Sequence, residues 1–268
     1  MSEPFDPRGR VALVTGASSG IGEALAIELA ARGARVALVA RRGDRLAVLA
    51  REIVAAGGQA EAFICDVSEP EAVTATHAAI ARVLGPVEIL VNAAGYVRHV
   101  LFADHDPDDV EQMMRTNYLG SVRFIQAVLP GLRTARRGWI VNVSSFAGLV
   151  PQPDEAAYSA TKAALTSLSE ALSYELESDG IHVMVVHPIL VRTEMFTPEV
   201  MVRMPKGSEK RFISPERFAR ATLRALERGE RSVVIPRSYR GVLWLRALSP
   251  RRMGRLMARV KLRGLEDG

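Results

Sequence analysis

A tyrosine and a lysine stand four positions apart in the run Tyr158-Ser159-Ala160-Thr161-Lys162, where a long stretch with helical spacing begins. In an α-helix, side chains at i and i+4 share one face, so the phenol and the ammonium can act together. A free phenol has a pKa of about 10, and lowering it to about 7 takes roughly 4 kcal/mol, which two nearby cations can supply. The pair therefore indicates acid–base chemistry, or else an ordinary amphipathic helix start with a lysine whose stem covers apolar surface.

Ser145 precedes this tyrosine by thirteen residues and ends the run Ile140-Val141-Asn142-Val143-Ser144-Ser145. The apolar part of the run predicts a buried strand, and the hydroxyl then emerges at the carboxyl end of that strand. Ligands of open α/β sheets bind at this edge. The alternative is a polar side chain that only caps the strand end.

A glycine segment, Thr15-Gly16-Ala17-Ser18-Ser19-Gly20-Ile21-Gly22, follows the apolar run Val11 to Val14. A helix is predicted to begin near Glu23. Glycines allow a sharp turn and let a pyrophosphate approach the backbone N–H groups at the helix N-terminus. The spacing Gly-x-x-x-Gly-x-Gly therefore predicts a dinucleotide site, and its alternative is a tight turn without a ligand.

The choice of dinucleotide depends on the end of the second apolar run, where Arg41 and Arg42 stand in place of an acidic residue. A guanidinium pairs with a 2′-phosphate, whereas a carboxylate repels it, so these residues favour NADP(H) over NAD(H) unless they only complete an exposed basic loop. Asp66 is a candidate contact to the adenine, or belongs to the N-cap region of a helix starting near Pro70.

Seven short apolar runs alternate with stretches of helical spacing along the 268 residues. This order predicts an α/β fold with a doubly wound parallel sheet of about seven strands in a single domain. The runs are Val11 to Val14, Val36 to Val39, Ala62 to Ile64, Ile89 to Val91, Ile140 to Val143, Val183 to Val186 and Val233 to Ile235.

Taken together, these residues resemble the short-chain dehydrogenase/reductase family, in its compact single-domain branch, over roughly Gly9 to Val234. The family's motifs occur in order: the glycine segment, Asn92-Ala93-Ala94-Gly95 after the fourth run, Asn117, then Ser145, Tyr158 and Lys162, and finally Pro188 with Thr193. The resemblance implies a Rossmann-like fold and a cofactor site made by Gly16, Ser18, Ser19, Gly20, Ile21, Gly22, Arg41, Arg42, Asp66, Val67, Asn92, Ala94, Gly95, Tyr158, Lys162, Pro188 and Thr193.

The resemblance also implies roles for the catalytic set Asn117, Ser145, Tyr158 and Lys162. Tyr158 exchanges a proton with the substrate oxygen while the nicotinamide exchanges a hydride, and Ser145 hydrogen-bonds the same oxygen. Lys162 binds the nicotinamide ribose and lowers the pKa of Tyr158, and Asn117 holds a water. No metal is implied.

Two positions depart from the family pattern. Ala93 stands where an Asn is usual, which predicts a weaker sheet-stabilising hydrogen bond, and Ile189 stands where Gly follows the proline. Since a glycine reaches positive φ at low cost and isoleucine does not, Ile189 makes the backbone path beside the nicotinamide uncertain.

The C-terminal part carries the substrate expectations. Residues 193–212, rich in Met, match the family's variable substrate lid and favour an apolar ketone or alcohol, lipid-like or steroid-like, unless they form a helix packed on the core. Residues 238–268 follow the catalytic domain, 1–237, as a basic amphipathic extension that lies on anionic lipid or covers its own or a partner subunit.

Composition limits the other classes of function. Residues 203–268 hold 18 Lys and Arg against 6 Asp and Glu, a net charge of +12, but no nucleic-acid-binding motif accompanies them. One cysteine, Cys65, and the absence of a signal-like N-terminus or an apolar span predict a cytoplasmic protein. The resemblance implies a homo-oligomer, dimer or tetramer. A nucleotide-binding scaffold, or a peripheral membrane protein that acts through the extension, remains the alternative function.

Overall fold

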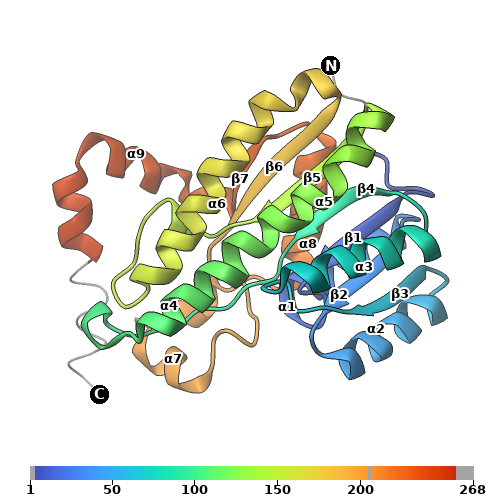
Figure 1. The fold of residues 1–268 in the computed structure, drawn as a ribbon. Helices are drawn as coiled ribbons and strands as arrows, with labels where there is room; N and C mark the ends of the chain where they lie inside the picture. Colours follow the sequence, from blue (N-terminus) through green and yellow to red (C-terminus); the bar gives the residue numbers. More distant parts are fainter. Residues whose placement is uncertain (1–3, 205–206, 258–268) are drawn as a thin grey trace.

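The structure is a computed structural model that describes residues 4–204 and 207–257. Seven strands form one parallel sheet in the order β3-β2-β1-β4-β5-β6-β7 (Figure 1). Each of the seven predicted apolar runs lies inside one strand, so the predicted sheet is confirmed. The strands are β1 (Val11–Thr15), β2 (Arg35–Ala40), β3 (Gln59–Ile64), β4 (Val87–Asn92), β5 (Gly138–Val143), β6 (Ile181–Pro188) and β7 (Ser232–Ile235).

The strand order reverses direction beside β1. The chain runs from β1 outward to β2 and β3, and then returns so that β4 pairs with the other edge of β1. Connections on the two sides of such a switch point diverge, which leaves a crevice beyond the carboxyl ends of the strands. The fold therefore places the glycine segment after β1 next to the Asn92–Gly95 segment after β4.

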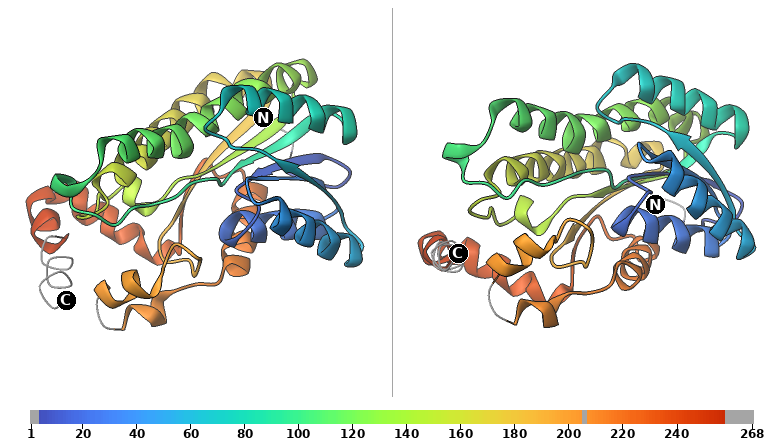
Figure 2. Two further views of the ribbon diagram at one scale, coloured as in Figure 1. Left: turned by 60° about the horizontal axis from the view of Figure 1, so that its bottom comes forward. Right: turned by 90° about the horizontal axis from the view of Figure 1, so that it is seen from below.

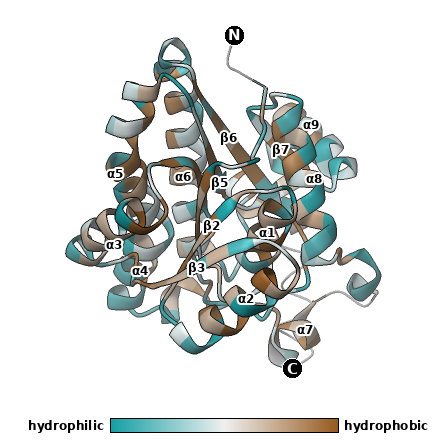
Figure 3. Ribbon diagram, turned by 90° about the vertical axis from the view of Figure 1, so that its right-hand side faces the viewer, coloured by the Kyte–Doolittle hydropathy of each residue, from teal (hydrophilic) through white to brown (hydrophobic). Residues whose placement is uncertain are grey.

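Helices cover both faces of the sheet (Figure 2). The helices α1 (Gly20–Ala31), α2 (Gly43–Ala55) and α8 (Pro215–Glu227) pack on one face, and α3 (Pro70–Val83), α5 (Gly120–Ala135) and α6 (Ala156–Glu175) pack on the other. Side chains of β1 alternate between the two apolar clusters, with Val14 on the α1 side and Leu13 on the α5 side. Because both faces are buried at the centre of the sheet, the central strands are mostly hydrophobic (Figure 3), whereas the edge strand β3 is mostly exposed and includes the polar residues Gln59 and Glu61.

The helical connection before α5 contains an irregularity that the sequence analysis did not predict. The helix α4 (Pro107–Met114) begins at Asp106, whose side chain accepts a hydrogen bond from the backbone N–H of Asp108. It continues through a single π-helical stretch, Arg115–Leu119, directly into α5. Extra residues of this kind inside a helix shift the register of the side chains and often mark functional sites. Here the stretch carries Asn117.

Short helices complete the described chain: η1 (Phe102–Asp104), η3 (Phe146–Gly148), η4 (Glu177–Asp179), α7 (Pro198–Arg203), η5 (Ser208–Arg211), η6 (Arg237–Tyr239) and α9 (Arg240–Leu248). A further helical segment, 250–257, follows α9. Among the described residues, no helix combines the length and the apolar character needed to cross a bilayer.

The described part of the C-terminal extension packs on the catalytic unit. Met253 is buried in a third apolar cluster with Phe146, Val150 and Val234. Four further side chains of this region pack against the same cluster, namely Tyr239, Val242, Leu243 and Met257. These contacts favour the interpretation in which the extension covers its own subunit. The domain boundary at residue 237 stays a prediction, and residues 258–268 of the predicted extension lie outside the described residues.

Candidate active site

A cavity of about 670 Å3 lies at the carboxyl ends of the central strands, and its wall combines almost all of the predicted site residues. Two predicted residues, Asn92 and Asn117, are not part of the cavity lining. The predicted residues that line it are Gly16, Ser18, Ser19, Gly20, Ile21, Gly22, Arg41, Arg42, Asp66, Val67, Ala94, Gly95, Ser145, Tyr158, Lys162, Pro188 and Thr193. Segments that are distant in the sequence thus converge on one cavity, as predicted.

The glycine segment passes so close to other backbone that side chains cannot fit. A Cβ on Gly22 would lie 2.3 Å from the carbonyl oxygen of Gly16, and a Cβ on Gly16 would lie 2.8 Å from that of Ala93. Gly16 also has a φ of 67°, which side chains other than glycine rarely adopt. The helix α1 begins at Gly20, three residues before the predicted start, so its free N–H groups face the cavity.

The two arginines after β2 differ in their contacts. Arg42 Nε donates to Ser18 Oγ at 3.1 Å, and its Nη2 donates to Ser19 Oγ at 2.6 Å. Arg41 is largely exposed, and its Nη1 lies 3.6 Å from Asp66 Oδ2. The other carboxylate oxygen of Asp66 accepts from the N–H and the hydroxyl of Ser68. The structure therefore gives Asp66 a local turn contact as well as a place in the cavity wall.

The three polar residues of the catalytic prediction meet at one end of the cavity. Ser145 lies two residues beyond β5, Tyr158 lies in the first turn of α6, and Lys162 follows one turn later. The hydroxyl of Ser145 accepts from the backbone N–H of Ala147 at 3.1 Å and is hydrogen-bonded to the phenol of Tyr158. The Nζ of Lys162 lies 5.8 Å from the centre of the Tyr158 ring and donates to the carbonyl oxygen of Val143 at 2.9 Å.

The lowering of the pKa of Tyr158 by Lys162 together with a bound nicotinamide cation stays a prediction, because Lys162 is not among the groups that shift this pKa in the protein alone. Desolvation by the surrounding protein raises the pKa of the Tyr158 phenol, although the hydrogen bond with Ser145 lowers it, and the charge of Glu155 raises it further. Desolvation also lowers the pKa of the buried Lys162 to about 8. The ammonium is thus a weaker source of positive potential than its spacing from Tyr158 suggested, because burial disfavours its own charge.

Asn117 does not line the cavity but hydrogen-bonds to residues on two neighbouring segments. Its Oδ1 accepts from the backbone N–H of Tyr96 at 2.9 Å, and its Nδ2 donates to the Tyr96 carbonyl at 2.8 Å and to Thr161 Oγ1 at 3.2 Å. The fully buried side chain therefore joins the segment after β4 to the first turns of α6. Its predicted contact with a water stays a prediction.

Asn92 also lies inside the sheet. Its Nδ2 donates to Asn142 Oδ1 at 2.8 Å, and Asn142 Nδ2 donates to Ser169 Oγ at 2.9 Å. Both strands end close to this pair, so the amides tie β4, β5 and α6 together below the cavity. The buried side chain of Asn92 therefore supports the site through its hydrogen bond to β5 and does not line the cavity.

The two departures from the family pattern have different outcomes. The backbone N–H groups of Ala93 and Ala94 both donate to Thr15 Oγ1, at 3.0 and 3.1 Å, so the segment stays attached to β1. Ile189 is not among the described residues with positive φ, and its side chain packs against the third apolar cluster. The isoleucine therefore follows a backbone path that does not require glycine.

The predicted lid segment forms one wall of the cavity. Seven lining residues come from it: Thr193, Glu194, Met195, Phe196, Thr197, Val200 and Met204. Phe196 packs edge-to-face on Phe212, with ring centres 4.7 Å apart, which joins the two ends of the segment. That it moves as a lid stays a prediction.

Sequence analysis missed several polar residues of the cavity. His99 Nδ1 lies 3.2 Å from Glu155 Oε1 and 4.0 Å from Asp154 Oδ2, so three ionisable side chains meet near Tyr158. The geometry of these three is one that can hold a metal ion, although acidic groups are common without one. The prediction of no metal stays a prediction. Glu194, which lines the cavity, and its ion-pair partner Arg45 were also missed.

Comparison with known proteins identifies the family. Residues 10–201 match the family described as short chain dehydrogenase, which is most of the chain. The chain belongs to this family, a family of oxidoreductases, and the predicted resemblance is confirmed.

Individual relatives show how far the similarity extends. An uncharacterised oxidoreductase of Mycobacterium tuberculosis is 41% identical over 196 residues, which cover 71% of this chain and 58% of that protein. The match thus spans less than two thirds of the mycobacterial protein. An 11-beta-hydroxysteroid dehydrogenase-like protein of Arabidopsis thaliana is 36% identical over 248 residues, 90% of this chain and 78% of that one.

A solved structure agrees with the fold. The short-chain dehydrogenase from Sphingobium yanoikuyae in complex with NADPH superimposes with a TM-score of 0.79 and 30% sequence identity. The alignment covers 92% of this chain and 95% of the other.

Proposed function

We propose that the protein is an NADP(H)-dependent oxidoreductase that interconverts an apolar ketone and the corresponding secondary alcohol. The observation that carries the proposal is the meeting of Ser145, Tyr158 and Lys162 at one end of a cavity whose other end holds the glycine segment and Arg42. Tyr158 and Lys162 would hold the nicotinamide end of a bound dinucleotide, and Arg42 would hold its adenosine end.

The cofactor end of the cavity fits a phosphorylated dinucleotide. The close backbone approach at Gly16 and Gly22 leaves room for a pyrophosphate beside the N-terminus of α1. Arg42, with the hydroxyls of Ser18 and Ser19, offers donors for a 2′-phosphate. The NADPH complex of the Sphingobium relative supports the same assignment.

The proposed reaction divides between cofactor and protein. NADPH, when bound, supplies the hydride that forms the new C–H bond at the carbonyl carbon. Tyr158 donates its phenolic proton to the carbonyl oxygen, and Ser145 holds that oxygen by a hydrogen bond. Lys162 carries the positive charge that stabilises the phenolate left behind. In the reverse direction, Tyr158 accepts the proton of the alcohol.

The substrate class follows from the lid segment. Met195, Phe196, Val200 and Met204 contribute apolar side chains to the lining of the same cavity as Tyr158, and flexible methionine side chains adapt to varied apolar shapes. The steroid dehydrogenase-like relative from Arabidopsis supports a steroid-like or lipid-like substrate.

A panel of apolar ketones and alcohols, assayed with NADPH and NADP+ by nicotinamide absorbance, tests the proposal. We expect turnover of at least one class, and a loss of about 100- to 10,000-fold in kcat for Tyr158→Phe. Tyr174→Phe, on the exposed face of the same helix, is the matched control and retains wild-type rates. Equal rates in Tyr158→Phe and wild-type protein would exclude the proposed proton transfer.

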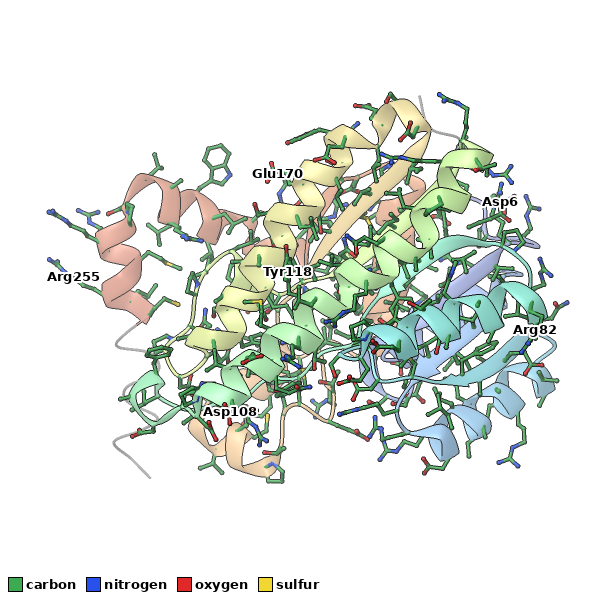
Figure 4. All side chains as sticks on the ribbon, in the orientation of Figure 1. Asp6, Arg82, Asp108, Tyr118, Glu170 and Arg255 are labelled. Atoms are coloured by element: carbon green, nitrogen blue, oxygen red, sulfur yellow. The ribbon has the colours of Figure 1, made fainter. Side chains whose placement is uncertain are left out.

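A second candidate function, contact with anionic lipid, is favoured by the outer face of the extension. Trp244 and Leu248 are 71% and 82% exposed, and Arg246, Arg251, Arg252 and Arg255 are exposed beside them. Arg255 points away from the sheet in Figure 4. Apolar side chains interleaved with arginines suit the interface of a negatively charged membrane.

Sedimentation with phosphatidylserine-containing vesicles tests lipid contact. We expect binding that falls for the double variant Trp244→Ala, Leu248→Ala and is absent with neutral vesicles, whereas Tyr174→Ala binds as the wild type does. Self-association through the same face, seen as dimers that the double variant loses while vesicle binding stays absent, would replace this candidate. Homo-oligomerisation through the helices that carry Asn117 and Tyr158 is proposed separately, by resemblance.

A further inference from the structure

Glu194, which lines the cavity, forms ion pairs with two arginines, Arg42 and Arg45. Its Oε2 accepts from Arg42 Nη1 at 2.9 Å, and its Oε1 pairs with Arg45 Nη1. Arg42 follows β2, Arg45 lies in the first turn of α2, and Glu194 directly follows Thr193 at the start of the lid segment. The contact therefore joins the lid segment to the edge of the sheet.

The same guanidinium serves the hydroxyls and the carboxylate. Arg42 donates through Nε to Ser18 and through Nη2 to Ser19, while Nη1 reaches Glu194. We call Arg42, Arg45, Ser18 and Ser19 the anion site. Two guanidiniums and two hydroxyls at this spacing form a set of donors that suits a phosphate. One carboxylate balances only one of the two positive charges.

The ion pairs of Glu194 with Arg42 and Arg45 are weak enough for an anion of higher charge to replace the carboxylate. The side chains of Glu194, Arg42 and Arg45 are 58%, 40% and 45% exposed, and ion pairs this exposed contribute little to stability because water screens them. Hydrogen bonds from Arg45 and Arg42 hold the pKa of Glu194 below its usual value, so the carboxylate is charged at neutral pH. A phosphate monoester carries up to two charges and three acceptor oxygens.

We propose that the Glu194 carboxylate occupies the anion site as an internal competitor of the cofactor's 2′-phosphate, which displaces it on binding. The inference rests on the proposed NADP(H) specificity and extends it, because it makes Arg45 a further 2′-phosphate ligand. It also makes Glu194 a residue that sets how strongly the phosphate is preferred.

Displacement follows from charge. A phosphate bound by Arg42 and Arg45 places about two negative charges beside the position that Glu194 holds, and like charges this close repel. The Glu194 carboxylate moves away from the two arginines, and the start of the lid segment moves with it. Because Met195 and Phe196 follow immediately and line the cavity, the phosphate end of the cofactor becomes coupled to the substrate wall.

Titration of the full-length protein with 2′,5′-ADP and with 5′-AMP measures the contribution of the 2′-phosphate alone, because the two ligands differ in that group and neither contains nicotinamide. We expect Glu194→Gln to bind 2′,5′-ADP about fivefold more tightly than the wild type, the effect of removing an exposed competing charge. Binding of 5′-AMP changes less than twofold. The matched control Glu209→Gln removes one negative charge from the exposed η5 turn of the same segment and leaves both affinities unchanged.

The results separate the inference from the proposed function. If wild-type protein binds NADPH no more tightly than NADH, the proposed cofactor specificity fails. If it prefers NADPH while Glu194→Gln binds 2′,5′-ADP equally or more weakly, then Glu194 does not compete and the inference alone is overturned.

Hydrogen exchange supplies a second readout. We expect the backbone amides of residues 194–197 to exchange faster in wild-type protein when 2′,5′-ADP is bound, and to exchange at that faster rate in Glu194→Gln without ligand. Unchanged or slower exchange in both cases would overturn the coupling to the lid segment.

Discussion

The ammonium of Lys162 is directed at the sheet: its hydrogen bond goes to the carbonyl oxygen of Val143, at the end of β5, while the Tyr158 ring centre is 5.8 Å from Nζ. Two consequences follow from this relationship. The hydrogen bond from the lysine attaches the first turns of α6 to the end of β5, and it thereby helps to position Tyr158 relative to the sheet. Its charge reaches the phenol across the ring, where desolvation of both groups opposes ionisation.

The rates of ketone reduction and alcohol oxidation should depend on pH differently. Since desolvation raises the pKa of Tyr158, the neutral phenol that donates a proton is the major form through neutral pH. We expect ketone reduction to be nearly flat from pH 6 to 8, and alcohol oxidation, which needs the phenolate, to rise with pH over that range. Rates of both directions with one ketone and its alcohol, measured at saturating cofactor, check this. An oxidation rate that stays level to pH 9 would contradict it.

Removing the buried charge of Lys162 should stabilise the fold. Its pKa falls from 10.5 to about 8, so protonation costs the folded state on the order of 3 kcal/mol below pH 8, and nothing above pH 10.5. We expect Lys162→Met to be inactive but to unfold at a higher temperature than the wild type at pH 7. The difference should shrink between pH 8 and 10.5.

Thermal unfolding of Lys162→Met across pH 7 to 11, beside the exposed control Lys210→Met, measures this effect. The control should match the wild type throughout. A lower melting temperature for Lys162→Met at every pH would show that the hydrogen bond to Val143 outweighs the desolvation of the ammonium.

The two arginines after β2 should contribute unequally to cofactor choice. Arg42 already donates to Ser18 and Ser19, whereas Arg41 is exposed and pairs with Asp66. A charge-assisted hydrogen bond contributes about 1.5–3 kcal/mol, so we expect Arg42→Ala to weaken NADPH binding about 10- to 100-fold with little effect on NADH. Arg41→Ala should weaken NADPH less than Arg42→Ala does. Fluorescence titrations of both variants decide between them, and the reverse order would move the 2′-phosphate to Arg41.

His187 should make the protein sensitive to acid. This fully buried side chain in β6 contacts the carbonyl oxygen of Ser145 and the hydroxyl of Ser232, each at 3.3 Å. Desolvation lowers its pKa from 6.5 to about 4, so its contribution to stability is complete above pH 6.5 and is lost as the pH falls through 4. We expect His187→Gln to lose less stability than the wild type between pH 6.5 and 4. Parallel denaturation curves over that range would contradict this.

The sheet and most of the cavity wall were predictable from sequence because both follow local rules. Strands buried on both faces appear as apolar runs, and polar residues just beyond them must meet at one edge in a parallel sheet. Ser145 was located in this way, whereas Thr193 was located by its resemblance to the family's segment after Pro188. The start of α1 was placed three residues late because Gly20, a poor helix former, begins the helix.

The contacts that were missed depend on three-dimensional neighbours. Arg45 and Glu194 are 149 residues apart, and no pattern in either segment points to the other. The π-helical stretch that carries Asn117 has no sequence signal of the kind that caps or glycines provide. The desolvation that raises the pKa of Tyr158 and lowers that of Lys162 was also missed, because spacing reveals the lysine but not the burial of both groups.

The packing of Met253 in one cluster with Phe146 connects the C-terminal extension to the active-site segment after β5. Phe146 directly follows Ser145. The C-terminal helix therefore stabilises the position of the residue that is proposed to hydrogen-bond the substrate oxygen. A protein without the extension would lose the packing of Met253 on this cluster as well as the arginines of the extension. Shortening the chain would therefore disturb turnover whether or not the missing segment ever meets a membrane, and single exchanges on the outer face are the cleaner probe.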